Sequence, residues 1–172
     1  LSSYETPANS FSLKDQIKVD ELTLLNINSV DEKVTKIINT SPYTMFHFFR
    51  GHWWPYCISE LVKLDDKKSL LDDLGIQIIP ICISDVSGAR LAKEKSKSSF
   101  KFYCDPKSTV SKQFGLLHKS GHPFNGSDIS QIGKVLVDSN GFILWTHFTM
   151  NSRVRLTSDL LVDQLRKTIT SL

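Results

Sequence analysis

The residues with the clearest chemical potential lie between Arg50 and Cys57, where the chain reads RGHWWPYC. A single cysteine follows a Pro-Tyr pair directly after an apolar run, and no second cysteine stands three residues before it. If a helix begins at this point, the thiol lies in its first turn, where unpaired N–H groups and the helix dipole stabilise an anion. Because the thiolate is the nucleophilic form of cysteine, the position predicts a reactive Cys57. A buried structural cysteine is the alternative that the same pattern leaves open.

Several neighbours of this thiol support the prediction. Pro55 suits a first helical turn, because its missing N–H would be unpaired there anyway. Arg50 can add positive potential, and His52 is a candidate for tuning the thiolate. Glu60 fits a contact with the positive end of the helix, which is a structural role.

The remaining cysteines form neither a disulfide framework nor a metal-ligand pattern. Cys82 stands within an apolar run and is interpreted as a core residue. Cys104 could resolve an oxidised Cys57 only if the two sulfurs come within disulfide reach. Since three thiols leave at least one free in a monomer, we expect a reducing, cytoplasmic location. Because the sequence shows no metal-ligand pattern, we also expect no metal, and we expect no cofactor.

The composition is that of an ordinary globular protein, with 172 residues, 40% hydrophobic and 23% charged residues, and a net charge of +3. The lysines of residues 93–97 are interrupted by Glu94 and a serine, which indicates a solvated helix face and no nucleic-acid partner. No apolar run approaches the roughly 20 residues of a membrane span, so we expect no membrane insertion. Because the chain begins at Leu1, we expect that a preceding piece was removed.

Hydrophobic periodicity predicts an alternation of strands and helices. The predicted helices are 31–39, 58–74 (closed by Gly75), 87–98, 107–114 and one capped by Thr157; the predicted strands are 43–49, 76–83, 100–103, 132–137 and 142–147. Residues 116–131 are predicted to be loop, and Asn140-Gly141 to turn a hairpin. Pro80 fits poorly inside its strand, because proline removes a ladder donor.

A βαβ half followed by a ββα half is typical of the thioredoxin skeleton. We therefore predict an α/β protein with a central mixed β-sheet flanked by helices and extra material inserted between the halves. Residues 41–172 would form this domain, and residues 1–40 an N-terminal extension packed on it.

The segment RGxWxPYCxxEL resembles the Arg-Gly-x-Trp-Cys-Pro-Tyr-Cys-x-x-Glu-Leu motif of peroxiredoxin-like proteins in the alkyl hydroperoxide reductase/thiol-specific antioxidant (AhpC/TSA) superfamily. Further segments are similar to the frame of that superfamily: residues 81–85 (ICISD), 102–106 (FYCDP), 110–117 and 135–143. The resemblance covers Met45 to Leu165 and implies a peroxiredoxin-type insertion in a thioredoxin-like fold.

This resemblance implies that Cys57 attacks a hydroperoxide. Trp54 stands where the family has its first cysteine, or ordinary peroxiredoxins a threonine, so an external thiol would be the reductant. Trp53 and Trp54 most simply pack over the start of the helix and shield it, and the alternative is that Trp54, with Pro55 and Tyr56, lines a peroxide pocket. The protein could form a homodimer. A family arginine near the thiolate is replaced by the approach Gln131-Ile-Gly-Lys134; Arg50 is then our first choice, ahead of Arg155 and Arg153.

Two alternatives to a peroxidase remain. The same scaffold without a paired thiol could be a catalytically weak redox sensor or a partner-binding protein. A disulfide isomerase is less consistent with the sequence, because Trp54 removes the second cysteine that such chemistry needs.

Overall fold

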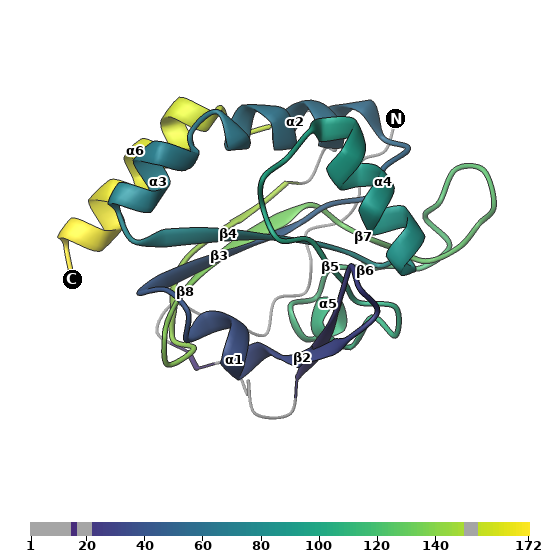
Figure 1. Cartoon of the computed structure of the whole chain (residues 1–172), viewed down its shortest axis with the longest axis horizontal. Helices are drawn as coiled ribbons and strands as arrows, with labels where there is room; N and C mark the ends of the chain where they lie inside the picture. The colour runs from purple at the N-terminus through teal and green to yellow at the C-terminus, as the bar shows by residue number, and fades with distance from the viewer. Residues whose placement is uncertain (1–14, 17–21, 150–154) are drawn as a thin grey trace.

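The computed structural model describes residues 15–16, 22–149 and 155–172 of the chain (Figure 1). Its elements are β1 (Thr23–Asn26), β2 (Asp31–Lys33), α1 (Val34–Ile38), β3 (Tyr43–Phe48), α2 (Pro55–Asp65), α3 (Lys68–Asp73), β4 (Ile76–Cys82), α4 (Val86–Ser96), β5 (Tyr103–Cys104), α5 (Thr109–Gln113), β6 (Leu117–His118), β7 (Ile129–Ser130), β8 (Gly133–Asp138), β9 (Ile143–Phe148) and α6 (Ser158–Thr170).

A seven-stranded sheet in the order β2-β1-β5-β4-β3-β8-β9 runs through the molecule. Strands β3, β4 and β5 are parallel to one another, and the other pairings of this sheet are antiparallel. The expected mixed sheet is therefore confirmed. Its central strand β3 takes β4 on one side and β8 on the other, so the two halves of the predicted skeleton meet at β3.

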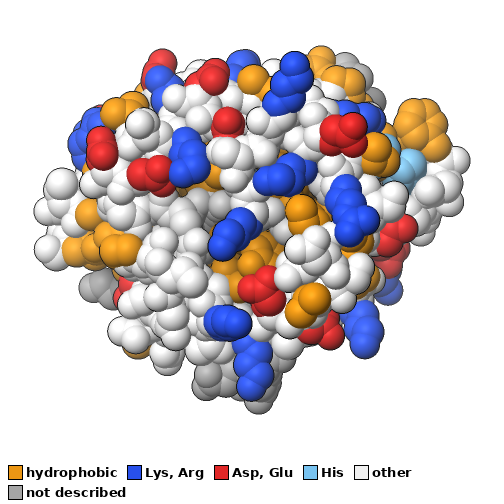
Figure 2. All heavy atoms as spheres, in the orientation of Figure 1, with side chains coloured by type: hydrophobic (Ala, Val, Ile, Leu, Met, Phe, Trp, Pro, Cys, Tyr) orange, Lys and Arg blue, Asp and Glu red, His pale blue; other side chains and the backbone are white. Residues whose placement is uncertain are grey.

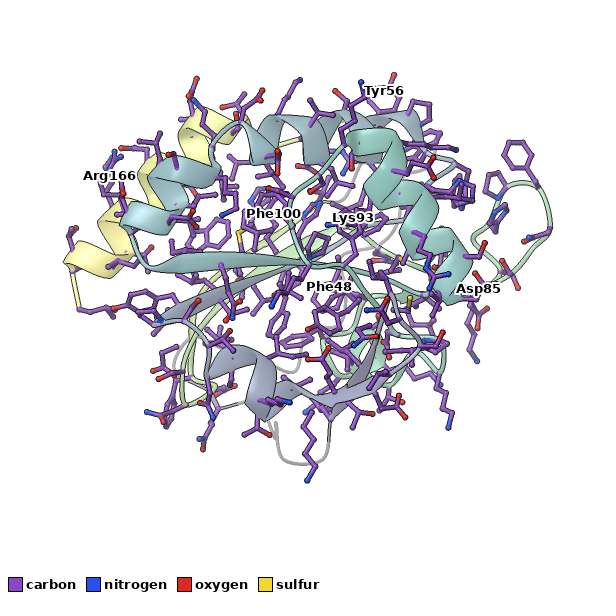
Figure 3. All side chains as sticks on the ribbon, viewed as in Figure 1. Phe48, Tyr56, Asp85, Lys93, Phe100 and Arg166 are labelled. Carbon is purple, nitrogen blue, oxygen red and sulfur yellow. The ribbon has the colours of Figure 1, made fainter. Side chains whose placement is uncertain are left out.

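Helices cover both faces of this sheet (Figure 1). Helices α2, α3, α4 and α6 lie on one face, and α1 and α5 on the other. Each face has its own apolar cluster: one contains Cys57, Leu61, Phe100 and Leu165, and the other contains Phe48 and Phe114. Figure 3 shows Phe100 and Phe48 on opposite sides of the ribbon of the sheet. Side chains of β3 alternate between these clusters, which explains why its sequence is apolar throughout.

The helix predicted over 58–74 is two helices, α2 and α3, separated at Asp66 and Lys67. Polar residues 65–68 interrupt the apolar stripe there, and the C-cap Asp66 closes the first helix. Gly75 follows α3 with φ +75°, the left-handed conformation expected of it. The predicted helix 31–39 is wrong in its first turn, since residues 31–33 form β2 before α1 begins.

The region 116–131 is not loop throughout. Its ends form the two-residue strands β6 and β7, which pair antiparallel. The strand predicted at 100–103 is shorter and later, at Tyr103–Cys104. Strands of two residues carry no readable alternation, so periodicity could not place them.

Pro80 is accommodated inside β4 because of how short β5 is. On one side Pro80 is in register with His47 of β3. On the other side β5 pairs only with Ile81 and Cys82. At Pro80 the strand therefore behaves as an edge strand on that side, where the missing N–H costs no ladder bond.

Residues 23–38 contribute β1, β2 and α1. Strand β1 joins the sheet by pairing antiparallel with β5, in the register Leu25↔Cys104. The predicted hairpin is confirmed: Asp138 Oδ1 accepts the N–H groups of Asn140 and Phe142 at 2.9 and 3.0 Å. Thr157 caps α6 as predicted by accepting from Leu160 N–H at 3.3 Å.

Charged side chains of both signs are interspersed over the face seen in Figure 2. On this face Lys and Arg side chains form no continuous stripe without acidic neighbours. In the part of the chain that the structure describes, no helix combines the length and the apolar character needed to cross a membrane.

Candidate active site

Cys57 lies in the first turn of α2, directly after the loop that follows β3. Trp54 is the N-cap residue with extended backbone (φ −98°, ψ 108°), and Pro55 begins the helix as expected. The Cys57 N–H donates to the Trp54 carbonyl at 3.0 Å, which tightens this turn. The thiol is 0% exposed and belongs to the apolar cluster beneath α2. The fold therefore places the sulfur at a helix N-terminus but beneath the protein surface.

Arg155 contacts this sulfur from the segment before α6. Its Nη2 donates to Cys57 Sγ at 3.4 Å, and its Nη1 donates to Glu60 Oε1 at 2.8 Å. Glu60 lies one turn after Cys57 on α2, so the carboxylate holds the guanidinium against the thiol. A guanidinium held in this way stabilises negative charge on the sulfur.

Glu60 is the centre of a buried charge cluster. Lys134 of β8, with a side chain only 1% exposed, donates to Glu60 Oε2 at 2.8 Å. Burial by itself would raise the pKa of Glu60, but the neighbouring cations, chiefly Lys134, outweigh burial and lower this pKa to about 2. Glu60 is thus ionised at neutral pH and compensates the charges of Lys134 and Arg155.

His47 of β3 lies beside the same carboxylate, with Nε2 at 3.6 Å from Glu60 Oε1. Burial, with a further contribution from the positive charge of Lys134, lowers the pKa of His47 to about 3. The imidazole is therefore neutral at pH 7, and its contact with Glu60 is not an ion pair. His47 is packed in the core at 0% exposure.

Two cavities of about 510 Å³ each flank the start of α2. The first lies between α2 and the segment before α6, and its walls include Tyr56, Glu60, Lys63, Arg155 and Leu156. Arg155 thus lines this cavity and also contacts the Cys57 sulfur. Figure 3 shows Tyr56 on the outer side of α2.

The second cavity contains the other predicted residues of the motif. The Arg50 guanidinium lies over the rings of Trp53 and Trp54, at 5.5 and 5.0 Å from their centroids. His52 Nδ1 lies 3.0 Å from Lys95 Nζ, and burial together with Lys95 lowers the pKa of His52. Arg50, His52 and Trp53 line this second cavity.

The predicted residues thus divide between two places. Cys57 and Arg155 are in contact, and Trp54, Pro55 and Tyr56 form the first turn of α2 and its cap. Cys104 lies on β5 beside Cys82 of β4, and both are buried. Arg153 lies outside the described residues. Within the described residues, no group of three or more His, Cys, Asp and Glu side chains could hold a metal ion.

Sequence reasoning missed the role of two residues. Lys134 was noted only as the residue that replaces an arginine, although it supplies a buried cation to Glu60. Glu60 was assigned a dipole contact, although it binds both cations and neighbours His47. The available signal was a lysine within the apolar strand 132–137, since a buried lysine requires a partner.

Three known structures share this fold over nearly the whole chain. A peroxidoxin, BcpB, from Mycobacterium tuberculosis matches with a TM-score of 0.74 at 14% identity, covering 94% of this chain and 99% of that one. A reduced Prx protein from Vibrio vulnificus in complex with hydrogen peroxide matches with a TM-score of 0.78 at 14% identity, covering 90% and 99%. A mutant of PrxQ from Xylella fastidiosa matches with a TM-score of 0.76 at 10% identity, covering 93% and 98%.

These likenesses establish the thioredoxin-like peroxiredoxin fold. Comparison with curated protein sequences gives no match. The model of the AhpC/TSA family matches residues 6–146, which extends the resemblance well before Met45 and ends before Arg155. Because the match spans most of the 172 residues, the chain belongs to the AhpC/TSA family.

Proposed function

We propose that the protein is a thiol peroxidase that reduces hydroperoxides through Cys57. The Cys57 thiolate attacks the distal oxygen of the hydroperoxide and the O–O bond breaks. The sulfur becomes a sulfenic acid, and the departing oxygen takes a proton and leaves as alcohol or water.

The contact between Arg155 and the sulfur is the observation that carries this proposal. A guanidinium at 3.4 Å from Sγ lies where negative charge is present on the thiolate and then develops on the peroxide oxygens. Glu60 fixes its orientation before substrate arrives. Donors held in this way in a partly dry site contribute most when charge appears in the transition state.

The first cavity supports a route for the substrate. It is bounded on one side by α2 and on the other by residues 155–158, and Arg155 forms its inner wall. Leu64 and Leu156 contribute apolar surface, and Lys63 contributes a cation at its margin. These walls suit a small hydroperoxide with an apolar substituent.

An external thiol completes the cycle in this proposal. It condenses with the sulfenic acid to give a mixed disulfide and water, and a second thiol then releases Cys57. Trp54 occupies the place where a neighbouring cysteine would otherwise supply that step. A reducing, cytoplasmic location and a homodimer are part of the same proposal and follow from the sequence expectations above.

The test is a second-order rate constant with hydrogen peroxide, measured beside free cysteine at the same pH. We expect a rate well above that of free cysteine, and a sulfenate trap bound to the peptide of residues 51–63. The variant Cys57→Ser should lose both the rate and the trapped adduct. A protein in which Cys57 stays unmodified after a stoichiometric dose of peroxide would contradict the proposal.

A second candidate function is a slow redox sensor, and the complete burial of Cys57 favours it. In that case oxidation marks the protein and no substantial turnover follows. The two functions differ in rate: a sensor reacts no faster than free cysteine, and its trapped adduct accumulates without sustained peroxide consumption in the presence of excess thiol.

A further inference from the structure

Two further thiols lie side by side on neighbouring parallel strands. Cys82 is the last residue of β4 and Cys104 the last of β5, and the ladder pairs them in register. Residues paired in this way project from the same face of a sheet. Both side chains are buried, at 1% and 0% exposure, in the same apolar cluster.

The two thiols are close enough that each shifts the pKa of the other. Each sulfur also contacts a polar group: Cys82 Sγ lies 3.0 Å from Ser84 Oγ, and Cys104 Sγ donates to the Asp85 carbonyl at 3.4 Å. Paired strands lie about 4.8 Å apart, which is within the range of about 4.4–6.8 Å between the Cα atoms of a disulfide. The backbone geometry therefore already permits a bond between these sulfurs.

We propose that Cys82 and Cys104 form a dithiol–disulfide couple, a second redox site that is independent of Cys57. The oxidant is a hydroperoxide. One thiolate attacks its distal oxygen and becomes a sulfenic acid with release of alcohol or water. The second thiol attacks that sulfenic sulfur, the S–O bond breaks, and a second water leaves as the disulfide forms. An external dithiol returns both sulfurs to thiols and is itself oxidised.

The two thiols shift each other's pKa in opposite directions. The neighbouring Cys82 thiol lowers the pKa of Cys104, against the opposing effects of burial, Asp85 and Asp105. The neighbouring Cys104 thiol, together with burial, raises the pKa of Cys82.

The second cavity lies beside the chain segments that follow this pair. The residues that follow the two cysteines in the chain line it: Ser84 and Asp85 after Cys82, and Pro106 after Cys104. Figure 3 shows Asp85 at the start of α4, at the margin of the molecule.

Peptide mapping tests this proposal, because trypsin places each cysteine on a different peptide: residues 51–63, 69–90 and 102–107. Folded, reduced wild-type protein and the Cys57→Ser variant are treated with hydrogen peroxide. Free thiols are then blocked under denaturing conditions, and the digest is analysed by mass spectrometry. We expect a linked pair of peptides 69–90 and 102–107 in both proteins, which dithiothreitol separates without denaturant before blocking.

Two matched variants, Cys57→Ser/Cys82→Ser and Cys57→Ser/Cys104→Ser, should not form the linked pair. A link between peptides 51–63 and 102–107 in the wild type would instead make Cys104 the resolving residue of Cys57 and would overturn the proposal. So would full blocking of Cys82 and Cys104 after peroxide treatment. Because the Cys57→Ser protein still carries both thiols, these results do not depend on whether Cys57 is a peroxidase.

Discussion

The two thiol sites of this protein are equally buried but differ in what surrounds the sulfur. Cys57 contacts a guanidinium held by Glu60, and a buried lysine completes that charge cluster. Cys82 and Cys104 lie in register on neighbouring strands, and their sulfurs contact a hydroxyl and a backbone carbonyl. In our two proposals, the cations beside Cys57 suit attack on an external substrate, whereas the register of Cys82 and Cys104 suits a bond between the two sulfurs. The exposed fraction of a cysteine is therefore a weaker guide to its chemistry than the groups that surround its sulfur.

The strongest way to break the charged site is to neutralise its centre. The variant Glu60→Gln leaves the buried Lys134 cation without its carboxylate, so we expect a loss of about 3–5 kcal/mol in the free energy of unfolding. Urea denaturation measures this loss, with the exposed Glu94→Gln as control. The double variant Glu60→Gln/Lys134→Met should recover much of the loss. A Glu60→Gln protein as stable as the control would show that the cluster carries no such energy.

Removing the Arg155 cation should slow the reaction of Cys57 and leave the Cys82–Cys104 pair unaffected. We expect Arg155→Met to lower the rate of Cys57 with hydrogen peroxide on the order of 100-fold, the usual cost of losing one preorganised donor. Formation of the linked 69–90 and 102–107 peptides should be unchanged. The exposed Arg166→Met on α6 is the matched control. Equal effects of the two substitutions on the Cys57 rate would mean that Arg155 has no electrostatic role.

Acid should weaken the charged site first, and His47 sets the beginning of that loss. Its pKa is about 3 in the folded protein and 6.5 when exposed, so the unfolded chain binds the proton first as pH falls. The contribution of His47 to the free energy of unfolding is therefore fully present above pH 6.5. Below pH 6.5 this contribution decreases by up to about 1.4 kcal/mol per pH unit. Glu60 has its pKa lowered from 4.5 to about 2, so it adds a second loss only below pH 4.5.

Unfolding measured from pH 7.5 to pH 4.5 checks this window. The variant His47→Gln should flatten the slope between pH 6.5 and 4.5, whatever its stability at neutral pH. The other four histidines also have pKa values lowered, mainly by burial, and retain a smaller slope. An unaltered slope would mean that His47 is not the main group titrating there.

The smallest expected effect concerns access to Cys57. Trp54 caps α2 and packs against the apolar cluster, with its ring 5.3 Å from that of Tyr56. We expect Trp54→Thr to open the region above the thiol and to raise its rate with peroxide by a few-fold, less than about 1.4 kcal/mol of activation free energy. Trp53→Thr, next to it, is the control. If the rate does not change, the indole serves packing alone.

The fold was accessible from the sequence because its main elements carry strong local patterns. The apolar run of β3, the Asn-Gly hairpin and the capped α6 each depend on residues close together in the chain. The short strands β5, β6 and β7 do not, since two residues cannot show a period. The division between α2 and α3 depends on a cap at Asp66 that composition alone does not reveal.

The candidate site was only partly accessible for a related reason. The position of Cys57 follows from its own helix, but its partners are remote: Lys134 and Arg155 lie 74 and 95 residues from Glu60. We preferred Arg50 because it is adjacent to the motif, whereas the contact measured at the sulfur comes from Arg155. The pairing of β3 with β8 brings Lys134 to Glu60, and Arg155 reaches the sulfur from the segment before α6.

That pairing also decides when the site can exist during synthesis of the protein. His47 on β3 is in register with Lys134 on β8, so the central strand β3 can pair on this side only after β8 has been synthesised. A growing chain released up to α5 already contains Cys57 and Glu60 but neither cation of the cluster. Its thiol lacks the contact with Arg155. If Cys57 acts as proposed, the ribosome therefore synthesises the thiol first and its charged neighbours last, and the site is complete only when β8 has paired with β3 and Arg155 has reached the sulfur.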